Sequence, residues 1–310
     1  MNAVNKSILF MLMSTLSLSV TGLLAKQLSG ELSVTLFSFL RFLVPALILL
    51  ILLILLRVKN LTFPKAGTLK PILLRALCIG LSQLCFIASL QTLTLVEGVV
   101  LFATGPLFIP LVEKLFMRGR IRVSTLAALA MAFTGVVMLA GGGSEITWRA
   151  DLLLGLAGGL FNSGSQLTLY KVSKTNMSPL EINFWAFGFA AVFLLPLTLF
   201  NDFDALLNMS VMAPEISSNT LWIGMMSLMI INTQVFRSKA YKLASSGSQL
   251  APLIFTNLLF TAVWQSLFFE DRMSQSQIVG MSLIVLAIIL NTCWVRFTAH
   301  RSGGLQARTS

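Results

Sequence analysis

Ten long apolar runs follow one another along the 310-residue chain, separated by short polar segments. A helix needs roughly 20 apolar residues to cross the hydrocarbon core of a bilayer, and the runs have about that length. They cover residues 7–26, 34–56, 71–93, 97–117, 124–141, 151–171, 179–200, 218–237, 246–269 and 275–296. A backbone in hydrocarbon must satisfy its own hydrogen bonds, so such runs predict helices. The sequence therefore predicts an all-α polytopic membrane protein with ten transmembrane helices.

The composition excludes the other classes of chain. Only 11% of the residues are charged and 56% are hydrophobic, whereas an ordinary soluble domain has roughly 25% charged residues. A disordered chain would be poor in large apolar residues. In a soluble protein the net charge of +11 would suggest nucleic acid. Here the basic residues gather in short loops, so the lipid bilayer is the expected partner and nucleic acid is not.

The charges also predict an orientation. When the N-terminus is placed in the cytoplasm, most of the 22 basic residues fall on the inner side, as the positive-inside rule requires. Arg75 and Arg237 are counted there with the inner segments, and Arg41 is left within a span. Both termini are therefore expected to be cytoplasmic. Short loops and the absence of organelle signals favour a multi-pass protein of a bacterial inner membrane.

The two halves of the chain resemble each other at a shift of about 145 to 152 residues. The matched pairs are Ser14/Gly159, Ser17/Asn162, Thr21/Gln166, Lys26/Lys171, Phe39/Phe184, Phe42/Phe187, Gln83/Asn232, Ser89/Ser238 and Thr104/Thr256. Each half has five runs, so the second half enters the membrane from the opposite face. This pattern predicts two inverted five-helix repeats, 1–141 and 151–297, with a glycine-containing linker at 142–150 and a cytoplasmic tail at 298–310. Inverted repeats are the usual construction of secondary transporters.

Several short stretches carry a resemblance to a known family. They read Phe39-Leu40-Arg41-Phe42, Ser89-Leu90-Gln91-Thr92-Leu93-Thr94, Thr104-Gly105-Pro106-Leu107-Phe108, Lys239-Ala240-Tyr241-Lys242-Leu243-Ala244 and Asp271-Arg272. With them the whole chain resembles the EamA-type family of the drug/metabolite transporter superfamily. Arg118-Gly119-Arg120 departs from the acidic-basic pair expected after the fourth helix. The resemblance implies a small-molecule solute, and a central cavity lined by helices one, three, four, six, eight and nine.

Polar side chains within the runs are the candidate substrate-binding residues, because lipid cannot satisfy their hydrogen bonds. They are Ser17, Thr21, Arg41, Gln83, Asn162, Gln166, Asn232 and Asn257. A single Ser or Thr more often joins two helices, worth roughly 0.6 kcal/mol per bond. For the amides, cavity lining and helix contact both stay open. Arg41 lies about seven residues from the outer end of its span, which favours snorkelling to the interface over contact with an anion.

Chemistry other than transport finds little support in the sequence. There is no nucleotide-binding GxxxxGK[ST] segment, and the one histidine, His300, lies in the polar tail. We therefore expect no enzyme, no cofactor and no metal site. Gly155 and Gly159 form a small-xxx-small face that predicts close helix packing.

The leading hypothesis is a secondary transporter of a small neutral, zwitterionic or aromatic metabolite, with amino-acid-like efflux favoured. An uptake carrier for a vitamin or nucleoside-like solute such as riboflavin is the alternative. A membrane receptor or assembly subunit is the hypothesis from a different class. Whether two copies pair as a homodimer is left open by the sequence.

Overall fold

The computed structural model describes most of the chain. The described residues are 3–56, 63–105, 107–108, 123–139, 150–203, 213–244, 250, 253–254, 256–269, 275–276, 278–287 and 289–290. They form helices and no strands, which confirms the predicted all-α fold. Residues 142–149 of the predicted linker and the predicted tail lie outside the described part.

The helices follow the predicted runs in order. They are α1 (Ala3–Leu28), α2 (Val34–Leu55), α3 (Ala66–Leu90), α4 (Leu95–Phe102), α6 (Val123–Leu139), α7 (Ala150–Ser173), α8 (Pro179–Asn201), α10 (Ala213–Leu243) and α12 (Thr256–Phe268). A shorter apolar helix covers Ile278–Ala287. Among the described helices, α1, α2, α3 and α8 are long and apolar enough to span a membrane by composition alone. The helices α7 and α10 are at least as long as α2 but carry more polar residues.

Helix starts are set by local capping. Ser33 accepts a hydrogen bond from the backbone N–H of Leu36 at the start of α2. Ser178, at the equivalent place before α8, forms a capping box with Glu181. Thr94 and Glu97 form a second capping box at the start of α4. Glu97 is 2% exposed, and its buried carboxylate accepts hydrogen bonds from the backbone N–H and the hydroxyl of Thr94.

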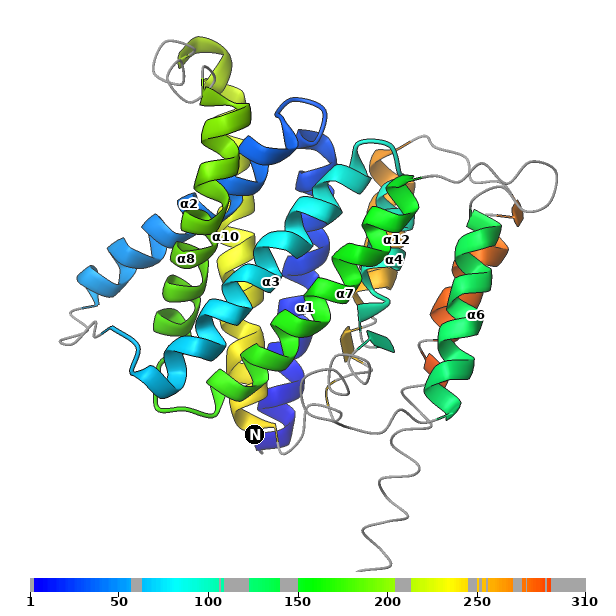
Figure 1. Ribbon diagram of the computed structural model, residues 1–310, viewed down its shortest axis with the longest axis horizontal. Coiled ribbons are helices and arrows are strands. Elements are labelled where there is room, and N and C mark those ends of the chain that lie inside the picture. The colour runs from blue at the N-terminus through cyan, green and yellow to red at the C-terminus, as the bar shows by residue number, and fades with distance from the viewer. Residues whose placement is uncertain are drawn as a thin grey trace, which may run out of the picture.

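The pairing of helices has the symmetry of an inverted repeat. The most extensive interfaces join α3 to α7, α1 to α10 and α2 to α8. Exchanging the two halves converts α1 into α7 and α3 into α10, so the first two interfaces are equivalent. The same exchange maps the α2–α8 interface onto itself. Figure 1 shows α1 (blue) beside α10 (yellow), and α3 (cyan) beside α7 (green).

Individual contacts join the same pairs of helices. The rings of Phe42 and Phe187, which the sequence comparison matches, lie 5.9 Å apart between α2 and α8. Equivalent residues of two halves can touch only where the symmetry axis passes. The Ser82 hydroxyl donates to the Gly158 carbonyl at 2.8 Å across α3 and α7. The Ser14 hydroxyl donates to the Thr233 carbonyl at 2.8 Å across α1 and α10.

A lysine in each half binds the end of a neighbouring helix. Lys26, in the last turn of α1, donates to two carbonyl oxygens at the end of α3, at 2.8 and 2.7 Å. Lys174, just after α7, donates to two carbonyl oxygens at the end of α10, at 3.3 and 2.6 Å. A cation there satisfies carbonyls that the helix leaves unpaired. The sequence comparison had matched Lys26 with Lys171, one turn earlier on α7.

The helix α6 lies at one edge of the bundle, beside the Ile278–Ala287 helix (Figure 1). Its Ala128 and Ala132 belong to an apolar cluster with Ile284 and Ala287. This cluster joins the edge to the rest of the bundle through α4.

Glycines on α7 allow α4 to approach closely, as the small-xxx-small pattern predicts. A Cβ atom at Gly159 would lie 2.8 Å from the Thr104 hydroxyl oxygen and 3.0 Å from the Leu101 carbonyl oxygen. A Cβ atom at Gly155 would lie 2.8 Å from the Leu101 side chain. The two separations of 2.8 Å are shorter than real Cβ contacts, so an added methyl group would force neighbouring atoms to shift.

We expect Gly159→Ala to lower the free energy of unfolding by about 1–3 kcal/mol, the usual cost of overpacking. Gly188→Ala in α8 is the matched control, because nothing lies within 4 Å of its added Cβ atom. That substitution should be neutral or stabilising by up to about 1 kcal/mol, since alanine favours helix. Thermal unfolding in detergent measures both. Equal stability of the two variants would contradict the close packing of α4 on α7.

Candidate substrate site

Two small cavities lie at the centre of the bundle. The axial cavity, about 30 Å³, is lined by Thr21, Arg41, Phe42, Gln83, Phe187, Thr233 and Gln234 among others. The amide cavity, about 50 Å³, is lined by Asn162, Gln166, Arg237, Tyr241 and Asn257 among others. Leu18 of α1 lines both cavities, so they adjoin the same side chain. Such volumes hold only a few water molecules, so a solute can enter only after the helices move apart.

The structure brings most of the candidate residues to these cavities. Thr21, Arg41 and Gln83 line the axial cavity, whereas Asn162, Gln166 and Asn257 line the amide cavity. Ser17 is buried in α1 but lines neither cavity. Binding of a solute by these residues stays a prediction.

Asn232 is placed elsewhere. It is exposed on α10, on the stripe of Leu221, Met225 and Leu228, which are large exposed apolar residues and face lipid. Ile79 and Gln83 of α3 line the axial cavity together with Ile230 and Gln234 of α10, at the same spacing along their helices, which matches Gln83 with Gln234. The match with Asn232 was two residues out of register. Two residues turn a helix by about 200°, which moves the side chain to the opposite face.

Arg41 is buried within the bundle, which argues against the snorkelling that the sequence favoured. Its side chain is 5% exposed, and its Nη1 atom has no hydrogen-bond partner. The guanidinium lies against the axial cavity, about 10 Å of helix rise from the start of α2.

Two further arginines that we had assigned to inner segments are also buried in the bundle. Arg75 of α3 is 0% exposed, and its Nη2 donates to Asn183 at 2.9 Å and to Gln234 at 3.1 Å. Arg237 of α10 is 3% exposed and lines the amide cavity. Arg41 and Arg237 make the cavity lining cationic, and Arg237 was not among the candidate residues from the sequence.

The lining amides are held by a hydrogen-bond network. Gln166 Nε2 donates to Asn162 Oδ1 at 3.2 Å, and the Tyr241 hydroxyl donates to Gln166 Oε1 at 3.3 Å. Gln234 Oε1 accepts from Arg75. The Gln83 Oε1 and Asn257 Oδ1 atoms are buried without a partner. Tyr241, Gln234 and Thr233 were missed as site residues, although Tyr241 stands in a stretch that carries the family resemblance.

Within the described part of the chain, no carboxylate lies at ion-pair distance from Arg41, Arg75 or Arg237. No group of His, Cys, Asp and Glu among the described residues could hold a metal ion. The centre of the bundle thus presents buried positive charge, amide groups and hydroxyls, which can bind a solute by hydrogen bonds and charge.

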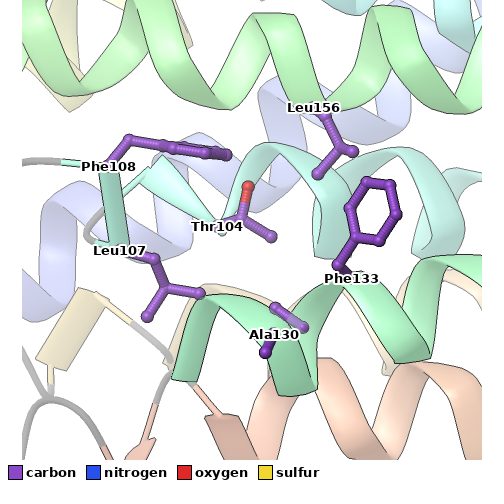
Figure 2. Close-up of a pocket in the computed structure, with 7 residues that line it drawn as sticks. Thr104, Leu107, Phe108, Ala130, Phe133 and Leu156 are labelled. Atoms are coloured by element: carbon purple, nitrogen blue, oxygen red, sulfur yellow. The ribbon is translucent and has the colours of Figure 1, made fainter. Parts of the chain in front are cut away.

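A larger cavity of about 430 Å³ lies between α6, α7 and the segment that follows α4. Figure 2 shows its lining, in which the Thr104 hydroxyl stands among Leu107, Phe108, Phe133 and Leu156. That hydroxyl donates to the Leu101 carbonyl of its own segment. The cavity therefore offers little to a polar solute, despite its size.

Comparisons with known proteins agree with this arrangement. The pseudopaline exporter CntI of Pseudomonas aeruginosa is 23% identical over 292 residues, covering 93% of this chain and 96% of the exporter. An uncharacterized transporter of Helicobacter pylori is 22% identical over 226 residues, covering 73% of this chain and 74% of that protein. A solved crystal structure superposes with a TM-score of 0.55 at 15% identity, covering 96% and 97% of the two chains, which shows the shared fold.

The family profile covers nearly the whole chain. The profile of the EamA-like transporter family matches residues 5–141 and 150–293. Together the two matches cover the helices described above, apart from the first two residues of α1. The chain belongs to the EamA-like transporter family and is a polytopic membrane transporter of small solutes.

Proposed function

We propose that this protein is a secondary transporter that exports a small, amino-acid-like organic solute across a bacterial inner membrane by alternating access. The observation that carries the proposal is the polar cavity on the symmetry axis, where Phe42 and Phe187 meet. Two equivalent halves can exchange conformations, which produces inward-open and outward-open states of similar energy around one site. The name of the Pseudomonas relative supports export as the direction.

The amide network supports an amino-acid-like solute. The unpaired oxygens of Gln83 and Asn257 can accept hydrogen bonds from an amino or hydroxyl group. The arginines that line the cavities can bind a carboxylate.

Flux into proteoliposomes tests the proposal. The protein should move its solute down a gradient without ATP. Asn162→Leu should raise the half-saturation concentration about tenfold, because a polar group of the solute would be buried without a partner, which costs roughly 1–3 kcal/mol. Asn232→Leu is the matched control, because that amide faces away from both cavities. An absolute requirement for ATP would refute a secondary transporter, and equal loss in both variants would refute the site.

The proposed orientation has its own measurement. With both termini in the cytoplasm, reporters fused after Gly142 and after Ser310 should report opposite sides of the membrane. Reports from the same side would contradict an odd number of spans in the second half.

A further inference from the structure

We propose that the transported solute is an organic anion with at least two acidic groups, one bound by Arg41 in the axial cavity and the other by Arg237 in the amide cavity. This inference rests on the transporter function proposed above and names the chemical class of its substrate.

Both arginines are buried without their full set of partners. The Nη1 atom of Arg41, and the Nε and Nη2 atoms of Arg237, have no hydrogen-bond partner. Removing an ion from water costs several kcal/mol unless a counter-charge or hydrogen bonds replace the water. The described residues provide no carboxylate near either group. An anionic solute supplies the missing counter-charge.

Arg75 differs from these two arginines because it serves the protein itself. Its Nη2 donates to Asn183 and Gln234, which joins α3 to α8 and α10. It lines neither cavity among the described lining residues. By occupying the oxygen of Gln234, it leaves the amide nitrogen of that residue as the group available to the axial cavity. A nitrogen donor suits a negatively charged oxygen.

The amide cavity is prepared in the same way. Asn162 Oδ1 accepts from Gln166, so the Asn162 nitrogen is left as a donor at the cavity wall. The tyrosine hydroxyl of the same wall already donates to Gln166. Each cavity therefore combines one incompletely paired guanidinium with one spare amide nitrogen, and both groups can donate hydrogen bonds to a carboxylate.

The position of the two cavities sets the shape of the solute. Leu18 lines both cavities, and each cavity is lined by one of the two incompletely paired arginines. A solute that neutralises both must extend past Leu18 with an acidic group towards each end. The unpaired oxygens of Gln83 and Asn257, one in each cavity, can accept from amino or hydroxyl groups along it.

Two measurements test this assignment: the shift of Tm on adding each probe to purified protein in detergent, and the transport of the probe into proteoliposomes. The probes are glutarate, adipate and pimelate, the aminated diacids glutamate and 2,6-diaminopimelate, the zwitterion leucine, the monoacid hexanoate and, for the phosphate source, fructose 1,6-bisphosphate. We expect a diacid of matching length to raise Tm and to be transported, whereas leucine and hexanoate do neither. A response to the bisphosphate alone would keep the two-anion assignment and name phosphate as the acidic group.

Variants separate binding from folding. Arg41→Gln and Arg237→Gln should each raise the half-saturation concentration of the diacid at least tenfold. Without solute, both glutamine variants should unfold at the same Tm as the parent protein or at a higher one, because a buried charge with missing partners has been removed. Lys239→Gln, on the exposed side of α10, removes one charge without touching either cavity and should bind as the parent does.

The outcomes also separate this inference from the transporter function. Transport of leucine with no response to any diacid or bisphosphate would overturn the anion assignment and leave the transporter intact. Diacid half-saturation unchanged in both glutamine variants would likewise overturn it. If no probe is moved or shifts Tm, both the substrate class and the proposed amino-acid-like transport are contradicted.

Discussion

Asn183→Leu is expected to lower the free energy of unfolding by about 3 kcal/mol. Asn183 is 0% exposed and accepts from Arg75 at 2.9 Å, while its nitrogen donates to the Pro179 carbonyl and to the Ser238 hydroxyl. A hydrogen bond to a charged group contributes about 1.5–3 kcal/mol, and leaving a buried charge with fewer partners costs more. Thermal unfolding in detergent, with a chemical denaturant series, measures the loss.

Asn232→Leu is the control for the same chemical change on a neighbouring helix. Its amide is exposed among residues that face lipid, so leucine should be neutral or stabilising there. If Asn183→Leu unfolds like the parent protein, the Arg75 network does not hold α3 to α8. If Asn232→Leu is the more damaging change, the assignment of the lipid-facing side of α10 is wrong.

Lys26→Met should cost about 2 kcal/mol of unfolding free energy. Its amine donates to two carbonyls at the end of α3 and is partly buried, and a cation at a helix C-terminus contributes up to about 2 kcal/mol in such a setting. Lys174→Met removes the equivalent contact at the end of α10. Lys174 is exposed, so solvent screens it and the expected loss is below about 1 kcal/mol.

Each lysine donates to two carbonyls, so the number of contacts is the same in both places. A difference in stability between the two variants therefore reports the effect of burial. Methionine keeps most of the apolar stem, so the loss reports mainly on the amine. If the two variants lost the same free energy of unfolding, at low salt and at high salt, exposure would not set the strength of these contacts. A larger loss at Lys174 would reverse the expected order.

The helical fold was accessible from the sequence because long apolar runs have few other solutions in a bilayer. The same reasoning identified Asn162, Gln166 and Asn257, since amides inside a span must face protein. Phe42 and Phe187 were correctly matched because large aromatic residues are distinctive among aliphatic neighbours, and they meet in the structure.

Burial of arginine could not be predicted from the same pattern. Arg75 and Arg237 lie near the ends of apolar runs, where a basic residue ordinarily reaches the interface. Only the packing of α3, α7, α8 and α10 shows that these ends are covered. The prediction for Asn232 was wrong for a different reason. A match between two apolar helices is uncertain by a residue or two, and an error of two residues selects the opposite face of the helix.

The interleaving of the two halves affects how the protein is made. The Ser14 hydroxyl of α1 finds its acceptor at Thr233, 219 residues later in the chain. At roughly 5–20 residues per second, a ribosome needs about 10–40 s to synthesise that interval. During this time the polar side of α1 lies in the membrane without its final neighbour. The first five helices therefore wait as an unfinished assembly, and the fold closes only when α10 has been inserted.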